Sequence, residues 1–245
     1  MKFAVMIPTY NERKSIAELL PELALLDLDI LVIDDNSPDK TADFVKSLNY
    51  KNVDILQRPN KDGLGNAYKA GIKYLLSKNM YTHLISMDAD GSHRVEDLQK
   101  LIAVAKQKPN SDLILGSRWI PGGAIENWPN TRKWLSKAGT WYAKLALKLK
   151  VNDLTGGFRI YPAKTLNQIN FDRITSNGYC YQIEMALAIS QLNGEIVEVP
   201  IKFIEREMGV SKMSNRIVLE AMAQITRWGL ALRITPNADK LHYVK

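Results

Sequence analysis

The chain has 245 residues, of which 46% are hydrophobic and 24% charged, a composition that excludes a disordered chain and fits one α/β domain or two small domains. Its single cysteine, Cys180, excludes an internal disulfide and a cysteine-based metal site, and suits a reducing compartment. The net charge of +7 is compatible with binding to nucleic acid, to an anionic membrane surface or to phosphorylated substrates.

Short β-branched runs alternate with segments of helical periodicity in the first half of the chain. We expect strands at 2–8, 29–33, 53–57, 83–87 and 112–117, and helices at 14–25, 40–48, 64–77 and 94–107. This alternation is typical of an α/β fold with a parallel sheet, right-handed crossovers and helices on both faces.

The pattern changes after Trp119. We expect a Pro-Gly-Gly turn at 121–123, helices at 132–150, 182–192 and 215–233, a strand at 195–200 and a polar loop at 205–214. The first apolar run is too short for a signal peptide, and no stretch reaches the roughly 20 apolar residues of a spanning helix. Any membrane contact is therefore expected to be peripheral or to depend on a partner.

Polar residues follow four of the predicted strands, at 8–12, 34–37, 88–90 and 116–118. The carboxyl ends of parallel strands lie at one edge of a sheet, and ligands of such folds bind beyond that edge. The sequence therefore predicts a single site there.

Asp88 and Asp90 are the first candidates for chemistry at this edge. Two carboxylates one residue apart, just after a buried strand, can share one hard cation such as Mg²⁺ or Mn²⁺ if the turn is tight. The alternative is that they only cap the helix that follows. Their position beside the other polar clusters favours the cation site.

Asp35 and its neighbours form the second candidate. A carboxylate at a strand end can accept hydrogen bonds from a base N–H or a ribose hydroxyl, and helix capping by Ser37 or Asp39 is compatible with this role. The glycines at 63 and 65 lack the third glycine and the preceding strand of a dinucleotide fingerprint, so we interpret them as a helix start.

Arg118, Arg206 and Lys212 are basic residues in predicted loops. Each would be a solvated surface charge in the simplest interpretation. Arg118, however, directly follows a strand at the predicted site, and the other two share a glycine-containing loop able to cover a diphosphate. Arginine offers bidentate contacts to phosphate.

The segment 132–150 carries basic residues and no acidic one. One helical face presents Trp134, Ala138, Trp141, Leu145 and Leu149, and a neighbouring face presents Lys133, Lys137, Lys144 and Lys148. This pattern predicts a membrane-surface helix with aromatic anchors. The alternative is an apolar stripe that faces the protein core beside a solvated basic face.

With these residues in view, the sequence closely resembles the polyprenol (dolichol) phosphate mannose synthases of glycosyltransferase family 2, from Met6 to about Trp228. The resemblance rests on IPTYNE, VIDDNSPDKT, MDADGSH, LGSRWIPGG, DLTGGFRIY, GYCYQIEM and EVPIKFIEREMGVSKMS, in that order. It implies a GT-A fold, an inverting mechanism, GDP-mannose as donor, a polyprenyl phosphate as acceptor, and Mg²⁺ or Mn²⁺ as cofactor.

The resemblance also assigns site residues. It implies a nucleoside pocket of Pro8, Tyr10, Glu12, Ile33 and Asp35, nucleotide contacts from Asp88 and Ala89, a metal site of Asp90 with Asp88 and Ser92, and phosphate contacts from Arg118, Arg206 and Lys212. Asp88, Asp90 and Arg118 are the expected catalytic residues. Serine is a weaker metal ligand than the glutamine that some family members have at the position of Ser92.

By the same resemblance, residues 1–119 form the nucleotide-sugar-binding half of one domain, 120–235 its acceptor-side and membrane-facing half, and 236–245 a tail. The expected membrane and acceptor face consists of Arg132, Lys133, Trp134, Lys137, Trp141 and Lys144. The chain resembles members without spanning helices. We expect peripheral contact at the cytoplasmic face of a membrane, alone or beside a small anchoring subunit, and no nucleic-acid partner.

Three other functions are weighed against this one. A UDP-glucose or UDP-N-acetylglucosamine donor would use the same motifs, which do not distinguish guanine from uracil. A sugar-phosphate nucleotidyltransferase would show a glycine-rich N-terminal loop where this chain has PTYNE. A non-catalytic basic module that binds membrane leaves the strand-end carboxylates unexplained.

A phosphate monoester acceptor has a second pKa of about 6 and is largely dianionic at neutral pH, so no dedicated base is expected. His93 is accordingly interpreted as structural.

Overall fold

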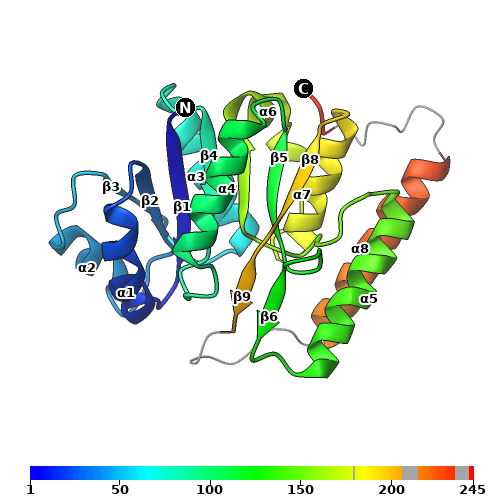
Figure 1. Cartoon of the computed structure of the whole chain (residues 1–245), viewed down its shortest axis with the longest axis horizontal. Helices are drawn as coiled ribbons and strands as arrows, with labels where there is room; N and C mark the ends of the chain where they lie inside the picture. Colours follow the sequence, from blue (N-terminus) through cyan, green and yellow to red (C-terminus); the bar gives the residue numbers. More distant parts are fainter. Residues whose placement is uncertain (179, 206–214, 235–242) are drawn as a thin grey trace.

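The computed structural model describes residues 1–178, 180–205, 215–234 and 243–245. Within these residues, a seven-stranded sheet has the order β3-β2-β1-β4-β7-β5-β8 (Figure 1). Its strands are β1 (Phe3–Thr9), β2 (Asp29–Asp34), β3 (Val53–Gln57), β4 (His83–Ser86), β5 (Leu113–Ser117), β7 (Arg159–Pro162) and β8 (Ile196–Pro200). All pairs are parallel except those of β7, which runs antiparallel to β4 and β5.

Helices cover both faces of the sheet because successive side chains of each strand point to opposite sides. Phe3, Val5 and Ile7 of β1 pack with α1 (Arg13–Ala24), α2 (Thr41–Ser47) and α4 (Val95–Gln107). Ala4 and Met6 pack with the opposite layer, which contains α3 (Leu64–Ser77), α6 (Ala163–Gln168) and α7 (Cys180–Gln191). A short 3-10 helix, Phe171–Arg173, follows α6.

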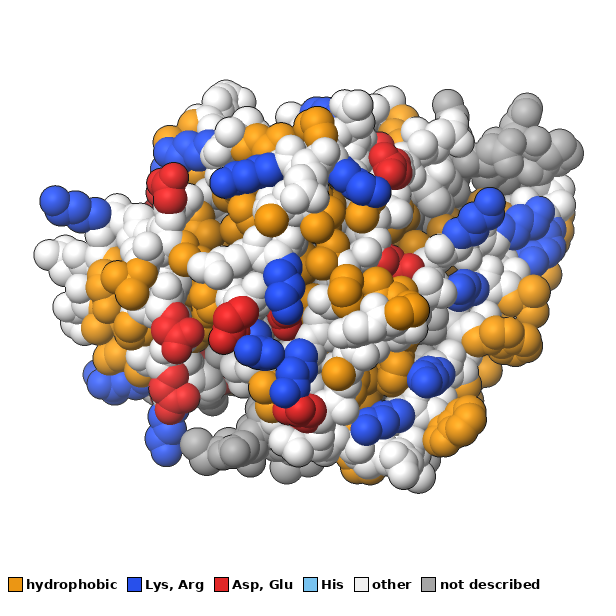
Figure 2. Space-filling model, in the orientation of Figure 1, with side chains coloured by type: hydrophobic (Ala, Val, Ile, Leu, Met, Phe, Trp, Pro, Cys, Tyr) orange, Lys and Arg blue, Asp and Glu red, His pale blue; other side chains and the backbone are white. Residues whose placement is uncertain are grey.

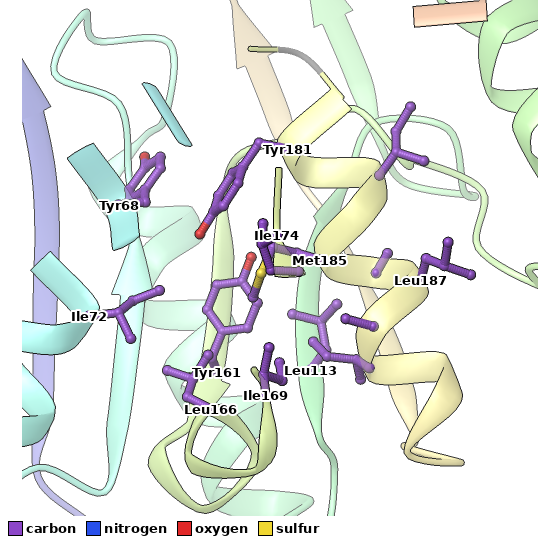
Figure 3. Packing of buried hydrophobic residues seen from close by; sticks show 14 of the residues in the cluster. Tyr68, Ile72, Leu113, Tyr161, Leu166, Ile169, Ile174, Tyr181, Met185 and Leu187 are labelled. Atoms are coloured by element: carbon purple, nitrogen blue, oxygen red, sulfur yellow. The ribbon is translucent and has the colours of Figure 1, made fainter. Parts of the chain in front are cut away.

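The second layer is rich in aromatic residues. Figure 3 shows Tyr68 of α3 beside Tyr181 of α7, with Tyr161 of β7 below them in the same cluster. The rings of Tyr68 and Tyr181 stack with centroids 6.0 Å apart. This layer therefore joins α3 and α7, whose first turns lie at the site edge of the sheet.

A pair of helices lies beside the sheet, at the right of Figure 1. α5 (Asn130–Leu147) packs along α8 (Asn215–Ile234), and Ile225 and Trp228 of α8 are buried. A Cβ at Gly229 would lie 2.8 Å from the carbonyl oxygen of Ala146, so the helices approach closely only because this residue is glycine. A two-stranded parallel sheet of β6 (Ala124–Glu126) and β9 (Lys202–Ile204) connects the pair to the main sheet.

The predicted fold class is confirmed. The strand at 53–57 and the helix at 64–77 have the expected bounds, and the other predicted elements agree to within three residues at each end. The prediction missed β6, β7, β9 and α6. β7 was missed because its four buried residues, RIYP, include a charge and a proline and have no period-two pattern.

Candidate functional site

Within the described residues, two cavities adjoin at the carboxyl edge of the sheet. The strand-end cavity, of about 390 Å³, lies beyond β1, β2 and β4 and beside the first turns of α3 and α7. The helix-pair cavity, of about 470 Å³, lies between that edge and the helices α5 and α8. The residues that line both cavities are Asp88, Asp90, Thr155 and Gly157. The predicted carboxylates therefore stand where the two spaces meet.

Most of the residues expected to bind the nucleotide-sugar line the strand-end cavity. They are Pro8, Tyr10, Glu12, Asp35, Asp88, Ala89 and Asp90. Ile33 does not line it: its side chain is fully buried and packs on α3, so that a Cβ at Gly71 would lie 2.4 Å from Ile33 Cδ1. In β2 the side chain of Ile33 belongs to the core.

Asp35 is held by a cation that the sequence analysis missed. Arg58 Nη1 donates to Asp35 Oδ1 at 2.7 Å, and the same guanidinium pairs with Asp62. Burial raises the pKa of the Asp35 carboxyl above its ordinary value, and Arg58 opposes this shift. Lys61 lies over the Tyr10 ring, 4.0 Å from its centroid. This end of the cavity thus offers a carboxylate, an aromatic ring and a lysine.

The Asp88–Asp90 turn is held by hydrogen bonds. Gly91 has a φ of 74°, which favours glycine and lets the chain turn back. Asp90 Oδ1 then accepts from the backbone N–H of Ser92 at 3.1 Å and from its hydroxyl at 2.6 Å. Ser92 is buried, and its hydroxyl orients Asp90. Tyr68 donates to Asp88 Oδ1 at 3.3 Å.

His93, which is buried, also holds the Asp88–Asp90 turn. Its Nδ1 accepts the backbone N–H of Asp88 at 3.0 Å, so the neutral ring carries its proton on Nε2. The ring is buried and stacks on Phe158 at 4.6 Å. Burial lowers the pKa of His93, although the nearby carboxylates act in the opposite direction. These contacts give His93 the structural role that the sequence suggested.

Arg118 lines the helix-pair cavity as one half of a buried ion pair. Its Nε and Nη2 each lie 2.7 Å from a carboxylate oxygen of Asp153, and Nη2 also donates to Thr155 Oγ1 at 2.8 Å. Burial by itself raises the pKa of Asp153, but the Arg118 guanidinium and backbone N–H hold it below its ordinary value. The guanidinium is therefore fixed in orientation.

The other predicted phosphate contacts, Arg206 and Lys212, lie outside the described residues. Next to them, Glu205 pairs with Arg132, whose guanidinium lies 4.0 Å from the Trp128 ring centroid. Arg132 and Glu205 both line the helix-pair cavity.

The walls of the helix-pair cavity are largely apolar. α5 contributes Leu135, Ala138 and Trp141 to the lining, α8 contributes Met222 and Ile225, and Trp128 and Phe203 add two aromatic rings. Asp88 and Asp90 lie where this cavity meets the strand-end cavity, and Arg118 also lines it. The cavity therefore fits a ligand with a charged head and a hydrocarbon tail.

The outer surface of α5 is exposed and hydrophobic. Trp134, Trp141 and Leu145 are 74%, 66% and 61% exposed. These values contradict the alternative of a core-facing stripe for these residues, although Leu149, just beyond the helix, is buried. Figure 2 shows basic and hydrophobic side chains along this edge of the molecule.

α8, which packs along α5, also carries exposed hydrophobic side chains: Leu230 and Ile234 are 52% and 73% exposed. The predicted basic residues lie beside it: Lys137 is exposed, whereas Lys133 and Lys144 are half-buried. In the described part of the chain, no helix combines the length and hydropathy needed to cross a membrane.

Sequence reasoning missed cavity residues on two loops. Thr155 and Gly157 come from the loop before β7, and Asn177, Gly178 and Gln182 come from the loop before α7 and its first turn. A Cβ at Gly63, which has a φ of 114°, would lie 2.7 Å from the Asn177 carbonyl oxygen, so this loop presses on the start of α3. The signals were present in DLTGGFRIY and GYCYQIEM, but neither motif shows which side chains face the cavity.

Comparison with known proteins gives consistent results. Residues 4–169 match the model of the family described as Glycosyl transferase family 2. The chain is 46% identical over 237 residues to "Undecaprenyl-phosphate mannosyltransferase" of Micrococcus luteus, covering 95% of this chain and 96% of that protein. It is 40% identical over 235 residues to "Polyprenol monophosphomannose synthase" of Mycolicibacterium smegmatis, covering 94% and 88%.

Two solved structures share the fold at low sequence identity. They are the mannosyltransferase PcManGT from Pyrobaculum calidifontis in complex with GDP-Man and Mn²⁺ (TM-score 0.59, 15% identity, 96% of this chain and 65% of that one) and S. aureus TarS 1-349 (TM-score 0.54, 17% identity, 99% and 78%). These likenesses confirm the predicted GT-A arrangement.

Proposed function

The chain belongs to glycosyltransferase family 2 and is a glycosyltransferase related to polyprenyl-phosphate mannosyltransferases, and we propose that it moves mannose from GDP-mannose to a polyprenyl phosphate with inversion at the anomeric carbon. One observation carries this proposal: a cavity lined by polar strand ends and a largely apolar cavity meet at Asp88 and Asp90. A nucleotide-sugar and a lipid phosphate would then meet at these carboxylates.

The strand-end cavity would hold the nucleotide. Its far end has the Asp35 carboxylate, which suits base N–H groups or ribose hydroxyls, and the Tyr10 ring, which suits stacking. The diphosphate would then lie toward Asp88 and Asp90. The solved PcManGT complex with GDP-Man supports a GDP-sugar in this fold.

Asp88 and Asp90 fit a divalent cation. Their carboxylates are the oxygen ligands that Mg²⁺ and Mn²⁺ prefer, and Ser92 would act by orienting Asp90. Among the described residues no group of three or more Asp, Glu, His or Cys side chains is placed to hold an ion, so diphosphate and water oxygens would complete its coordination. The bound ion would supply charge neutralisation of the leaving diphosphate.

The helix-pair cavity would hold the acceptor, with the prenyl chain against α5 and α8 and the phosphate near Arg118. Because the phosphate is largely dianionic at neutral pH, it needs no base to activate it. The buried, neutral His93 cannot accept a proton at Nδ1, which already accepts the Asp88 N–H. Catalysis then rests on in-line placement and on electrostatic stabilisation of the diphosphate.

The exposed surface of α5 and α8 would rest on the membrane that contains the acceptor. Trp134, Trp141 and Leu145 would enter the interface while lysines of α5 contact anionic headgroups. In this arrangement residues 1–119 supply most of the nucleotide side and 120–235 the acceptor side. The division is not strict, since Asn177 and Gln182 line the strand-end cavity. Contact at the cytoplasmic face stays a prediction.

A UDP-sugar donor is the nearest alternative, because the same cavity would serve uracil. The nucleotidyltransferase and non-catalytic alternatives are wrong, because the family and the relatives are glycosyltransferases.

The proposal is tested by transfer of radiolabelled sugar from GDP-mannose, UDP-glucose or UDP-N-acetylglucosamine to a polyprenyl phosphate in detergent, with Mg²⁺ or with EDTA. We expect metal-dependent labelling from GDP-mannose alone. Labelling from a UDP-sugar instead would overturn the donor assignment. Full activity in EDTA would overturn the proposed metal dependence.

A further inference from the structure

The side-chain amide of Gln182 is buried and has no hydrogen-bond partner within the described part of the chain. It lies in the first turn of α7, where residues 181–189 are all buried. The Gln182 side chain is only 4% exposed, and neither Oε1 nor Nε2 has a hydrogen-bond partner among the described residues. Buried polar groups are almost always paired because leaving them unpaired costs free energy. The neighbouring carboxylate of Glu184, which is also buried, is hydrogen-bonded within the fold. The unpaired amide of Gln182 therefore points to a ligand.

The Gln182 amide lies beside the junction of the two cavities. A Cβ built on Gly157 would lie 3.5 Å from Gln182 Nε2 and 3.6 Å from Asp88 Oδ2. Gly157 lines both cavities, and Gln182 lines the strand-end cavity. The amide and the Asp88 carboxylate thus border the same small space, kept open by the absence of a side chain at 157.

Arg159 holds this part of the site in place. The side chain is fully buried in β7, and Nη1 donates to the Gln182 carbonyl oxygen at 2.7 Å. Its Nε and Nη2 donate to the carbonyl oxygens of Gly156 and Leu154 at 2.8 and 2.9 Å. One guanidinium therefore ties the loop before β7 to the first turn of α7, so Gln182 and Gly157 keep a fixed separation.

We propose that Gln182 recognises a hydroxyl of the donor's sugar and determines specificity for it. The inference rests on the proposed function, since it takes the nucleoside to lie at Asp35 and the diphosphate at Asp88 and Asp90. The sugar then lies between the diphosphate and the acceptor, beside Gly157. A neutral amide with one donor and one acceptor group matches a hydroxyl, which is also both, better than a phosphate.

Such a contact discriminates strongly. A site built to pair with a hydroxyl disfavours an analogue without it, because the buried amide is then left unpaired again. The contact concerns the sugar alone, so it predicts an effect on nucleotide-sugar binding and none on binding of the nucleotide.

The test measures binding of GDP and of GDP-mannose by calorimetry in Mg²⁺, for the wild type, Gln182→Met and Gln182→Glu. We expect GDP-mannose to bind at least about 10-fold more weakly to Gln182→Met, with GDP affinity unchanged. The Glu variant keeps the size of the side chain but replaces the N–H donor with a second acceptor oxygen, and so shows whether the loss follows the amide. Gln191→Met is the matched control, because Gln191 ends the same helix and lines neither cavity.

Deoxy analogues locate the hydroxyl. The analogues are GDP-mannoses that lack the 2-, 3-, 4- or 6-hydroxyl. One of them should bind the wild type as weakly as GDP-mannose binds Gln182→Met. The same analogue and GDP-mannose should bind Gln182→Met with equal affinity, because the contact is already lost in that variant. Equal losses for GDP and GDP-mannose in both variants, or no loss in either, would overturn the assignment. If the wild type binds UDP-glucose and not GDP-mannose, the donor proposal fails, and UDP with UDP-glucose then tests Gln182 in the same way.

Discussion

Arg118 and Asp153 form a bidentate ion pair that is almost fully buried, with exposed fractions of 6% and 0% for the two side chains. Asp153 also accepts the backbone N–H groups of Arg118 and Gly156, at 3.0 and 3.1 Å. The carboxylate therefore joins the end of β5 to the loop that carries Thr155 and Gly157. Asp153 acts on the site by positioning Arg118.

Asp153→Asn should both destabilise the protein and slow transfer. Removing one partner of a buried pair leaves an uncompensated charge, so we expect the free energy of unfolding in urea to fall by about 3 kcal/mol. A double variant, Arg118→Met with Asp153→Leu, removes both charges and should recover most of that stability without recovering activity. If the double variant transfers sugar at the wild-type rate, Arg118 has no part in the reaction.

Asp90→Ala should abolish metal-dependent transfer, whereas Ser92→Ala should reduce it by about 10- to 100-fold, as expected for loss of a group that orients a metal ligand. The distinction follows from the short hydrogen bond from Ser92 to Asp90. Turnover measured against Mg²⁺ concentration checks it: Ser92→Ala should need more metal for half-maximal rate. Equal losses in both variants would make Ser92 itself a ligand.

Gly157→Ala should leave the fold intact and impair the reaction. The added Cβ would have only ordinary contacts, at 3.5 Å or more, so we expect the urea midpoint to stay close to that of the wild type. The methyl group would still occupy the junction of the two cavities, and misplacement of reacting groups by about 1 Å can cost about 100-fold in rate. Unchanged turnover would show that the reacting groups do not lie there.

Trp134→Ala with Trp141→Ala and Leu145→Ala should weaken binding to anionic liposomes by at least about 10-fold, because each exposed side chain loses apolar area that the interface would bury. GDP-mannose binding should be unchanged. Leu25→Ala is the matched control, since Leu25 is 87% exposed and follows α1 on the other side of the sheet. Undiminished liposome binding by the triple variant would show that another surface of the protein contacts the membrane.

Acidification should destabilise the protein through His83. Burial, assisted by the N-terminus and Lys164, lowers the pKa of His83 to about 4, against about 6.5 in an unfolded chain. Between these values the unfolded chain binds a proton that the folded chain does not, so stability present above pH 6.5 is lost as the pH falls toward 4. His83→Gln should make the fall in urea midpoint over this window shallower. Parallel curves of urea midpoint against pH for the wild type and His83→Gln would contradict the lowered pKa of His83.

Local sequence patterns were sufficient to predict much of the fold of this protein and the edge of the sheet that carries its site. The alternation of β-branched runs and helical periodicity predicted nearly every parallel strand and its helix, because each depends on neighbouring residues. The positions of Asp35, Asp88, Asp90 and Arg118 at strand ends then predicted the site edge, since parallel strands end together. The amphipathic pattern of α5 showed which residues share a face.

Most of the order of the elements, the edge of the sheet that carries the site, and the family could therefore be predicted from the amino-acid sequence. The three-dimensional packing was needed to show which side of α5 faces solvent, that β7 enters the sheet between β4 and β5, and that Asp153 pairs with Arg118. It also decided that Gln182 faces the cavity and Ile33 the core. These relations join residues that are far apart in the chain. They depend on how several elements pack together, and a local sequence pattern contains no information about that packing.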